Sequence, residues 1–449
     1  MNQVFHFILL AGLLIAITPL RAEPSGPIGL QEAVDIALEN NREIKISEFE
    51  VKASESSVRE VTGRFLPDIS FGGQYVRNVK KPVLFLGGGM GIPGMENGGS
   101  IEIGYNNSYQ ASLNASMPLY SRQLIKSRQA ASEQRGLTEV GLQDTRNRVT
   151  ADVKRAFYTV LLSREVRDVT QKRMRNAEQR LAEVRRLHDE GLATEYDILV
   201  AEVQVENLRP ELLQAKDELE ASKLQLKNIM GITGERDITI KGELEPAYMR
   251  PVHEAATPHN RQLITNNYLL RMLDRQIQLM ETNVEIERSS LYPTLSAFGS
   301  YQYETQDDSF DFGDYNWANS AAVGLQIQVP IFSGNSRRER VQQARIGVEQ
   351  AREQRAAAEE ALLTEIRTVN NRLKQIRERI EVSGLALQQA ERAYELSVIR
   401  FEQGLGTQTD IHNSELAYTT SRFNRLQAFY EYQITLVSLD QLKGELAAR

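Results

Sequence analysis

One stretch of the chain carries a glycine spacing that could cradle a phosphate. Residues 83–94 read VLFLGGGMGIPG and contain the pattern G-x-G-x-x-G at Gly89, Gly91 and Gly94. In a dinucleotide site this pattern opens a helix directly after a strand, so that backbone N–H groups hold the pyrophosphate. Here Pro93 and the sequence MENGGSIEIGY follow, and they do not form a helix. The stretch is therefore predicted to be an exposed loop, and no nucleotide cofactor is expected.

The remaining reactive side chains do not form a recognisable site. None of the five histidines makes an H-x-x-x-H pair, and HEAA at 253–256 lacks the second histidine of a metalloprotease motif. The chain has no cysteine, which excludes disulfides, thiol catalysis and Cys-ligated metals. We expect no catalytic residues, no metal and no cofactor. Basic residues are mixed with acidic ones at a net charge of −7, so no nucleic-acid partner is expected either.

Of the motifs in this sequence, only a turn that occurs twice suggests a function. GLATEYDI at 191–198 returns 213 residues later as GLGTQTDI at 404–411. The shared positions are Gly191/Gly404, Leu192/Leu405, Thr194/Thr407, Asp197/Asp410 and Ile198/Ile411. The glycines permit a tight turn, the leucines offer small apolar contacts, and the threonines can cap the helix that follows. The aspartates could favour the start of that helix through its dipole.

The whole chain consists of two sequence repeats, and the turn is one of several segments that match between them. LENNREIK (38–45) matches ITNNYLLR (264–271), and FLPDISFGGQY (65–75) matches LYPTLSAFGSY (291–301), both at an offset of 226. SLNASMPLYS matches GLQIQVPIFS at an offset of 212, and Gly231 matches Gly444 at 213. The first repeat therefore holds about 14 extra residues in the Gly-rich stretch around 81–107.

Each repeat has two segments in which apolar and polar residues alternate, which predicts strands. They lie at about 68–76 and 108–117, and at about 294–303 and 321–329. Each is about the 9–11 residues needed to cross a bilayer at a tilt. Their polar faces are small and uncharged, and aromatic residues sit near their ends, as in membrane barrels. Four strands cannot close a barrel, and open edges are not tolerated in lipid, so three protomers would share twelve strands.

Two long proline-free segments, 119–190 and 331–403, are predicted to be helices of about 100 Å at ~1.5 Å per residue, a length that implies coiled-coil packing. The helix after the first turn shows a heptad seam from Ile198 to Leu226, which Pro210 is expected to kink or loosen. The shorter helices, stacked end to end, would match a long one. Four prolines are predicted to mark the strand–helix boundaries, namely Pro67, Pro118, Pro293 and Pro330.

The predicted organisation begins with a signal peptide at 1–22, whose apolar run at 7–17 is too short to span a bilayer. The first repeat, 23–231, comprises helix 30–66, the two strands, helix 119–190 and helix 194–231. An inter-repeat equatorial segment at 232–257 includes one expected strand, 237–244. The second repeat, 258–449, comprises helix 258–292, the two strands, helix 331–403 and helix 407–444.

These features resemble the TolC-like outer-membrane efflux protein family over residues 30–444. The resemblance is carried by LQEAVDIALENN at 30–41, the FLPDIS and LYPTLS strand entries, the MPLYS and VPIFSG strand exits, and the two turns. It implies a mainly α protein with a membrane β-barrel, in which long coiled-coil helices form a periplasmic α-barrel below a trimeric twelve-stranded barrel in the outer-membrane lipid. It also implies a homotrimer that works with a periplasmic adaptor and, indirectly, an inner-membrane transporter.

The resemblance gives the two turns a role as the tunnel tips that dock the adaptor. It also implies that Asp410, and with it Asp197, forms an acidic ring that narrows the tunnel mouth, unless both are ordinary helix-start carboxylates. One departure is visible. Some family members lock the closed tip with an arginine and a tyrosine, and the matching positions here are Gly406 and Phe401. The lock must therefore differ in this chain.

Three functions fit the sequence to different degrees. The first is a passive conduit of a tripartite efflux or type I secretion system, for which a partner supplies the energy. The second is a secreted coiled-coil scaffold, which would explain the helices but not the strand lengths or paired prolines. The third is a general diffusion porin, which would not need hundreds of helical residues. We expect the first, and no enzyme activity.

Overall fold

The computed structural model describes residues 26–86, 99–233, 237–246, 249, 264–311 and 313–446. The predicted signal peptide and the G-x-G-x-x-G pattern at 89–94 lie outside these residues. Contacts divide the chain into two compact units. The helical unit comprises 1–41, 152–251 and 374–437, and the sheet unit comprises 42–151, 252–373 and 438–449. Each unit therefore combines segments of both sequence repeats, because the repeats pack on one another instead of folding separately.

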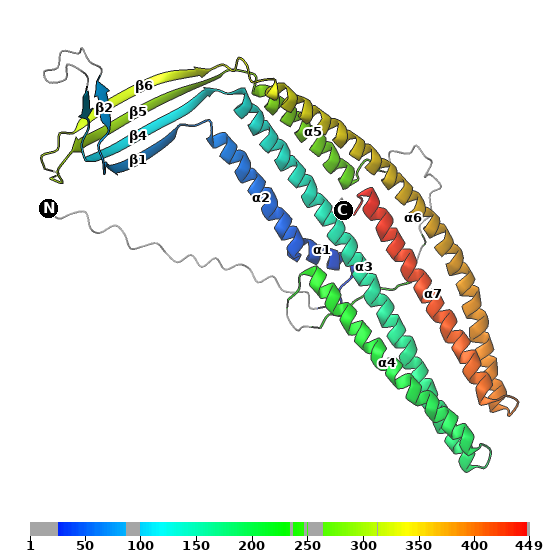
Figure 1. Ribbon diagram of the computed structural model, residues 1–449. Coiled ribbons are helices and arrows are strands. Elements are labelled where there is room, and N and C mark those ends of the chain that lie inside the picture. The colour runs from blue at the N-terminus through cyan, green and yellow to red at the C-terminus, as the bar shows by residue number, and fades with distance from the viewer. Residues whose placement is uncertain are drawn as a thin grey trace, which may run out of the picture. The chain divides into compact units, whose positions relative to one another are not determined.

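The sheet unit contains one antiparallel four-stranded sheet in the order β1-β4-β5-β6 (Figure 1). The strands are β1 (Asp68–Arg77), β4 (Asn107–Tyr120), β5 (Thr294–Asp307) and β6 (Ala318–Gln328). The central pairing joins the two repeats, because β4 belongs to the first and β5 to the second. β1 and β6 remain as edge strands with unpaired backbone groups.

The register of the sheet gathers the apolar positions on one face. Phe71 pairs with Leu113, which pairs with Tyr301, so the apolar residues of neighbouring strands lie side by side. Ser70, Asn114 and Ser300 are aligned in the same way on the other face. The apolar face is strongly exposed, with Phe71 at 76% and Val323 at 91% exposure. An apolar face of this kind suits lipid.

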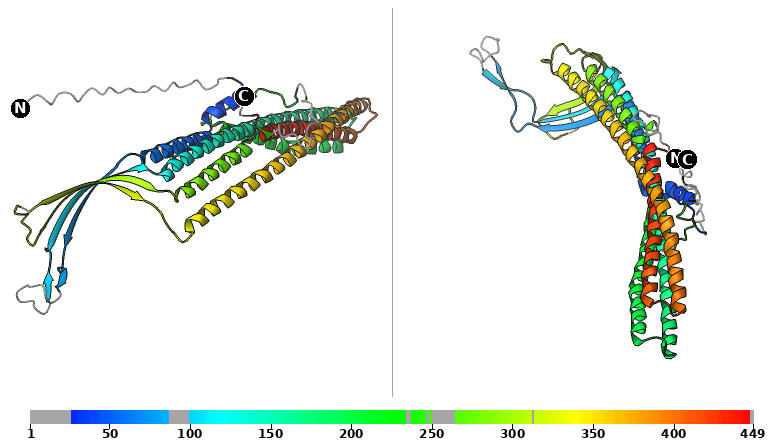
Figure 2. Two further views of the ribbon diagram at one scale, coloured as in Figure 1. Left: turned by 90° about the horizontal axis from the view of Figure 1, so that it is seen from above. Right: turned by 90° about the vertical axis from the view of Figure 1, so that its right-hand side faces the viewer.

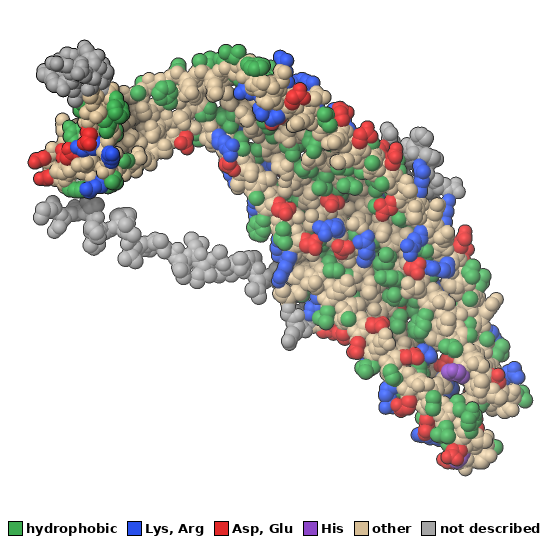
Figure 3. Space-filling model, in the orientation of Figure 1, with side chains coloured by type: hydrophobic (Ala, Val, Ile, Leu, Met, Phe, Trp, Pro, Cys, Tyr) green, Lys and Arg blue, Asp and Glu red, His purple; other side chains and the backbone are tan. Residues whose placement is uncertain are grey.

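The one predicted break in the alternation, Phe298 on the polar face, has a local explanation. Its partner across the β5–β6 ladder is Gly324, and a Cβ atom at Gly324 would lie only 2.7 Å from the Phe298 ring. The missing side chain of Gly324 makes room for the ring. Figure 3 shows, for one face of the molecule, that charged side chains gather over the helices and at the outer end of the sheet, the end away from the helices, and are sparse along the strands.

Aromatic residues meet at the outer end of the apolar face. Tyr75 stacks on Tyr109 with ring centroids 4.8 Å apart, and Tyr303 stacks on Trp317 at the same separation with an interplanar angle of 5°. Tyr315 lies 5.6 Å from Tyr109. Amphipathic rings at one strand end match the aromatic girdle that membrane barrels place at the lipid–water interface.

Most strand boundaries agree with the prolines. Pro67 and Pro293 directly precede β1 and β5, and Pro330 follows β6. Pro118 differs from the prediction, because it lies inside β4, where the register with β5 shifts between Pro118 and Tyr120. A proline can occupy a strand at such an irregularity, since no ladder hydrogen bond is required of it there.

The first-repeat insertion also contains structure that the sequence did not predict. β2 (Val83–Leu86) and β3 (Gly99–Glu102) pair as a separate antiparallel hairpin between β1 and β4. Figure 2 shows this hairpin extending away from the four-stranded sheet. The sequence predicted an exposed loop here but did not predict these two strands. Their short apolar runs lie beside glycines, which obscured the strand pattern.

The helices agree closely with the predicted segments. α3 (Arg122–Asp189) and α6 (Ser336–Glu402) are the two long helices, and α4 (Glu195–Met230) and α7 (Gln408–Lys443) follow the two turns. α3 packs on α4 through Met174, Ala177, Val205 and Leu208. α4 continues through Pro210, which lies on its exposed side, where water can satisfy the carbonyl left without a donor. None of the helices in the described part of the chain carries an apolar window sufficient to cross a membrane.

The first helix of each repeat is shorter than predicted. The segment 30–66 forms α1 (Leu30–Asn40) and α2 (Arg42–Gly63), with Asn41 extended between them. In the second repeat, residues 258–263 of the predicted helix lie outside the described residues. Among those described, α5 (Tyr268–Ser289) starts after Asn267, whose side chain accepts a hydrogen bond from the Leu270 N–H. Both helix boundaries therefore fall at the repeated pair of asparagines. The second asparagine of each pair caps a helix: Asn41 ends α1, and Asn267 begins α5.

The second asparagine of each pair also contacts the helix end that precedes a repeated glycine, Gly231 or Gly444. In the helical unit, the amide of Asn41 donates to the Ile229 carbonyl at the end of α4, at 2.8 Å. In the sheet unit, the amide of Asn267 donates to the Leu442 carbonyl at the end of α7, at 2.7 Å. Each contact closes a joint between the end of one helix and the asparagine pair. We call these two contacts the Asn–Gly joints.

The segment 237–244 does not form the expected strand. Its only ladder contact within the described residues is a single parallel bridge between Ile240 and Ile28. The Arg164 guanidinium on α3 instead donates to the carbonyls of Ile240 and Gly242, at 3.0 and 2.6 Å. The backbone groups of this segment are thus satisfied partly by the backbone of Ile28 and partly by the Arg164 side chain, and not by a strand ladder, which explains why alternation alone did not predict the structure.

Candidate functional site

The first turn joins α3 to α4 through a tight reversal and a helix cap. Gly191 has a φ of 77°, a conformation that residues with side chains rarely adopt, and its N–H donates to the His188 carbonyl at 2.9 Å. Thr194 then caps α4, because its Oγ1 accepts from the Asp197 N–H at 3.3 Å. The Asp197 carboxylate completes the box by accepting from the Thr194 N–H at 2.9 Å.

The second turn, between α6 and α7, repeats this geometry. Gly404 has a φ of 72°, and its N–H donates to the Phe401 carbonyl at 2.9 Å. Thr407 Oγ1 accepts from the Asp410 N–H at 3.2 Å, and the Asp410 carboxylate accepts from the Thr407 N–H at 2.9 Å. The two turns, which we call the tips, therefore have the same backbone path and the same cap. The glycine and capping roles predicted for the motif are confirmed by this geometry.

The leucine side chains of the tips are largely exposed in the protomer. Leu192 is 72% exposed and Leu405 is 67% exposed. Each directly follows its turn glycine, and its N–H, not its side chain, closes the turn by donating to a carbonyl of the preceding helix at 2.8 Å. Two exposed leucines at matching places are available for contact with another protein.

The tip aspartates stay charged more readily than ordinary aspartates. Hydrogen bonds from the Thr194 side chain and backbone lower the pKa of Asp197. For Asp410, the Thr407 backbone and then its side chain lower the pKa. A carboxylate that caps a helix keeps its negative charge, so the capping role and the predicted acidic ring do not exclude one another.

The two tips differ in charge although their backbones match. Residues 187–198 contain four carboxylates and no lysine or arginine, whereas the matching residues 400–411 contain two carboxylates and Arg400. The Arg400 guanidinium donates to the Leu405 carbonyl at 3.2 Å, within its own turn. A side chain at Gly406 would press on Arg400 and Phe401, at 3.2–3.4 Å. Gly406 therefore leaves room for Arg400 to close over the second tip.

A polar cluster that the sequence did not reveal lies about ten residues from both tips. It contains one side chain from each of the helices α3, α4, α6 and α7, namely Arg180, Gln204, Tyr394 and Glu415. Arg180 donates to Glu415 and, at 3.0 Å, to the Tyr394 hydroxyl. Gln204 also donates to Glu415, at 3.1 Å. We call this cluster the four-helix node.

The node is largely withdrawn from water. The side chain of Glu415 is 5% exposed and that of Arg180 is 17% exposed. Burial raises the pKa of Tyr394, so its hydroxyl remains neutral beside the ion pair. Such a pair is costly to break from one side only, because the remaining charge stays buried. The node therefore fastens the helices of the first repeat to those of the second near the tips, and its residues lie too far apart in the sequence to form a motif.

A cavity of about 610 Å³ lies beside the node, between α3, α6 and α7. Four basic residues line it, Lys172, Arg173, Arg175 and Arg422, together with four acidic residues, Asp168, Glu391, Glu395 and Glu415. The lining offers no net charge that would attract ions of one sign. Tyr394 and Tyr418 stack at its wall with ring centroids 5.8 Å apart.

Comparison with known families decides the identity of this fold. The family model described as "Outer membrane efflux protein" matches residues 33–232 and 260–445, one segment in each repeat. The chain belongs to the outer membrane efflux protein family. Membership makes it an outer-membrane export channel of the Gram-negative envelope that extends into the periplasm.

Individual relatives in the family are distant but cover nearly the whole chain. The cobalt-zinc-cadmium resistance protein CzcC of Cupriavidus metallidurans is 22% identical and covers 94% of this chain and 91% of its own length. The proteases secretion protein PrtF of Dickeya chrysanthemi is 21% identical, with 96% and 93% covered. The crystal structure of CusC superposes with a TM-score of 0.71 at 15% identity, covering 92% of this chain and 91% of that chain.

The family assignment confirms the main sequence-based expectations. The fold is that of TolC-family channels, which combine an α-barrel with a β-barrel in a trimer. The family consists of channel proteins and not of enzymes. A secreted scaffold and a general porin, the two alternatives, are not supported by it.

Proposed function

We propose that this channel is the outer component of a tripartite export system and that its two tips dock a periplasmic adaptor. The observation that supports the proposal is the duplicated tip: two turns with the same glycine conformation, the same Thr–Asp cap and an equally exposed leucine. Turn chemistry alone requires the glycine and the cap, but it does not require an exposed leucine at both positions. An inner-membrane transporter, reached through the adaptor, supplies the energy.

The charge difference between the tips gives the adaptor two unlike contacts. At the first tip Glu190 is paired with Arg186 at 2.6 Å, and the other three carboxylates favour a basic partner surface, whereas Arg400 weakens that preference at the second tip. In a homotrimer the two kinds of tip alternate around the mouth. Asp197 and Asp410 add negative charge to this ring, which attracts cations into the mouth and repels anions.

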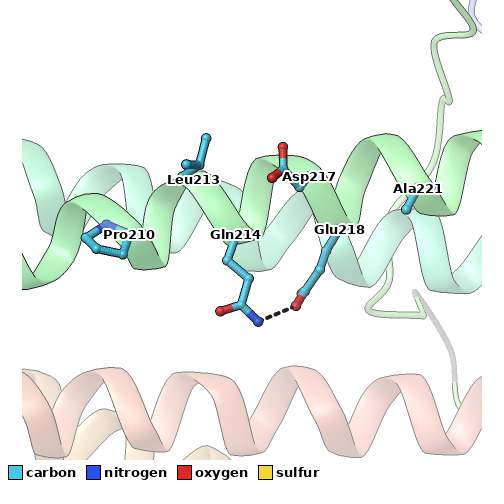
Figure 4. A pocket seen from close by; sticks show the side chains of 6 residues that line it. All are labelled: Pro210, Leu213, Gln214, Asp217, Glu218 and Ala221. Atoms are coloured by element: carbon cyan, nitrogen blue, oxygen red, sulfur yellow. Dashed lines mark hydrogen bonds between the residues drawn. The ribbon is translucent and has the colours of Figure 1, made fainter.

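Apolar stripes on the helical unit support assembly as a homotrimer. On α4, Leu199, Val203, Leu213 and Leu224 are each more than half exposed. On α6, Val382 and Leu385 are exposed in the same way at helical spacing. Around Pro210 the exposed side of α4 forms an open groove of about 420 Å³, lined by that helix alone (Figure 4). We infer that neighbouring copies cover these stripes.

The cargo follows from the transporter and not from the channel. CzcC is named for resistance to cobalt, zinc and cadmium, and PrtF is named for secretion of proteases. Two proteins of about equal similarity to this chain thus carry names for very different exports. We infer that the channel provides a shared exit and that its adaptor selects the system it serves.

The docking role is tested by changing the tip leucines without changing the turns. The double variant Leu192→Asp/Leu405→Asp keeps both glycines and both caps, so the trimer should assemble and reach the outer membrane. We expect loss of export, measured as restored sensitivity to the exported compound in cells that lack other channels, and loss of adaptor in pull-downs.

Leu269→Asp is the matched control, because Leu269 is an exposed leucine on α5, at 51%, and belongs neither to a tip nor to an apolar stripe. It should retain adaptor capture wherever the trimer forms. Normal export by the tip double variant would contradict the docking role. Export lost with adaptor capture intact would place the effect in the channel mouth instead.

A further inference from the structure

The β2–β3 hairpin exposes an apolar surface that the described part of the protomer does not cover. Leu84 and Ile101 pair directly across the hairpin and are 46% and 36% exposed. Phe85, on the opposite face, is 82% exposed, and Val79 at the base is 97% exposed. Glu102 is the only charged residue in the two paired strands. Both faces of the hairpin are therefore apolar and open.

A hairpin of this kind is not expected to be stable by itself. An isolated two-stranded hairpin is marginal in water, and it needs further strands or a packed face to persist. Within the described residues, its recorded attachments lie at the base, where Ile103 N–H donates to the Pro82 carbonyl and Lys81 pairs with Asp308 at 2.9 Å. These contacts orient the base but do not cover Leu84, Phe85 or Ile101. Another surface must cover them.

Lipid chains are the wrong cover for this position. The stacked rings of Tyr75, Tyr109, Tyr303 and Trp317 mark the lipid–water interface at the outer end of the sheet. The hairpin begins six residues after β1 ends at Arg77, beyond that ring of aromatic residues. Its surroundings are therefore aqueous, and the surface that covers it must be protein.

The position of the hairpin next to an edge strand indicates which protein covers it. β2 follows directly from β1, an edge strand of the four-stranded sheet. In a closed barrel of several copies, that edge must pair with the free edge, β6, of the neighbouring copy. The hairpin thus continues a boundary between copies. The second repeat has no such insertion, so a trimer would carry three hairpins around its outer mouth.

We propose that the β2–β3 hairpin is an intersubunit clasp, in which Leu84, Phe85 and Ile101 of one copy pack against neighbouring copies of this chain. The clasp rests on the trimeric channel proposed above and adds a contact outside the membrane. It also explains why only one of two otherwise matched strand connections is enlarged with apolar residues.

The experiment uses a photo-crosslinking residue, p-benzoyl-L-phenylalanine, in place of Phe85 in the full chain expressed in cells. Illumination should produce a crosslinked species of twice the chain mass in the outer-membrane fraction. The same residue in place of Tyr105, an exposed aromatic residue just before the central strand β4, is the matched control and should give little of that species. The double variant Leu84→Ser/Ile101→Ser should lower the temperature at which the trimer dissociates in detergent, whereas Lys80→Ser should not.

Each outcome bears on the clasp separately from the channel. Intact trimers with no crosslink between copies at position 85 would overturn the clasp and leave the channel proposal standing. Crosslinks only to lipopolysaccharide or to another protein would also overturn it. If no trimer formed with any variant or with the unmodified chain, the proposed trimeric channel would fail first.

Discussion

At the scale of single residues, glycine is required in this chain for two different reasons. Gly191 and Gly404 have open space around them, so only their positive φ excludes other residues. Gly231 and Gly444 also have positive φ, but an added Cβ would lie 2.6 Å from the Asn40 carbonyl oxygen and 2.3 Å from that of Asn266. The same residue type thus marks a turn in one case and a close approach in the other.

This difference predicts unequal effects of alanine. Gly191→Ala should cost only the strain of a left-handed residue, about 1 kcal/mol of unfolding free energy. Gly231→Ala should cost more than about 2 kcal/mol, because the methyl group also collides with backbone that cannot move freely. Denaturant unfolding of the purified channel in detergent measures both. Equal losses would contradict the close approach at the Asn–Gly joint.

The tip aspartates predict that acid loosens the tips. The pKa of both carboxylates is lowered in the folded state, so their caps stabilise the tips at pH values above the unfolded pKa of aspartate, about 4. This stabilisation is lost as the pH falls through the lower, folded pKa. Amide hydrogen exchange at the starts of α4 and α7 should therefore accelerate, relative to mid-helix amides, below about pH 4. Asp197→Asn/Asp410→Asn should remove that pH dependence.

At the scale of helices and strands, most local structure follows from short-range chemistry, but the connections between helices do not. The caps at Thr194 and Thr407 set where α4 and α7 begin, and the asparagine pairs set where α1 ends and α5 begins. The four-helix node adds a contact that no single helix pattern contains. A buried ion pair held by four helices fixes their relative placement near the tips.

The node should respond differently to single and double substitutions. Glu415→Ala leaves Arg180 buried without its carboxylate and should cost about 3 kcal/mol of unfolding free energy. Arg180→Met/Glu415→Leu removes both charges and should recover much of that loss. The exposed pair Arg135–Glu139 is the control, because its side chains are 44% and 46% exposed, and Glu139→Ala should cost less than about 1 kcal/mol. A Glu415→Ala effect as small as the control would show that the node is not structural.

At the scale of the whole molecule, the sheet is incomplete in one protomer. Its edges, β1 and β6, expose unpaired backbone groups, and its apolar face is open. Both features fit a strand set that closes only in an assembly within lipid. Each of the two compact units contains segments of both repeats. The helices and the sheet are therefore parts of one export channel.

Neighbouring residues on β6 test the orientation of the sheet in the membrane. Leu325 lies on the apolar face and Gln326 on the polar face. Leu325→Arg should cost about 2–4 kcal/mol in lipid and reduce the amount of trimer in the outer membrane. Gln326→Arg should insert normally and shift ion selectivity toward anions in single-channel recordings. The reverse pattern would mean that the faces are exchanged.

The sequence by itself determined the features that depend on local spacing. These are the duplication, the four main strands, the long helices and the two tips, because hydrogen-bonded helices and strands have fixed periods and glycine and Thr–Asp signals act within a few residues. Only the tertiary structure decided which distant residues meet. The pairing of β4 with β5, the Asn–Gly joints, the four-helix node and the exposed hairpin all join or expose residues whose partners are far away in the chain. Such contacts depend on packing and burial, and neither leaves a period in the sequence.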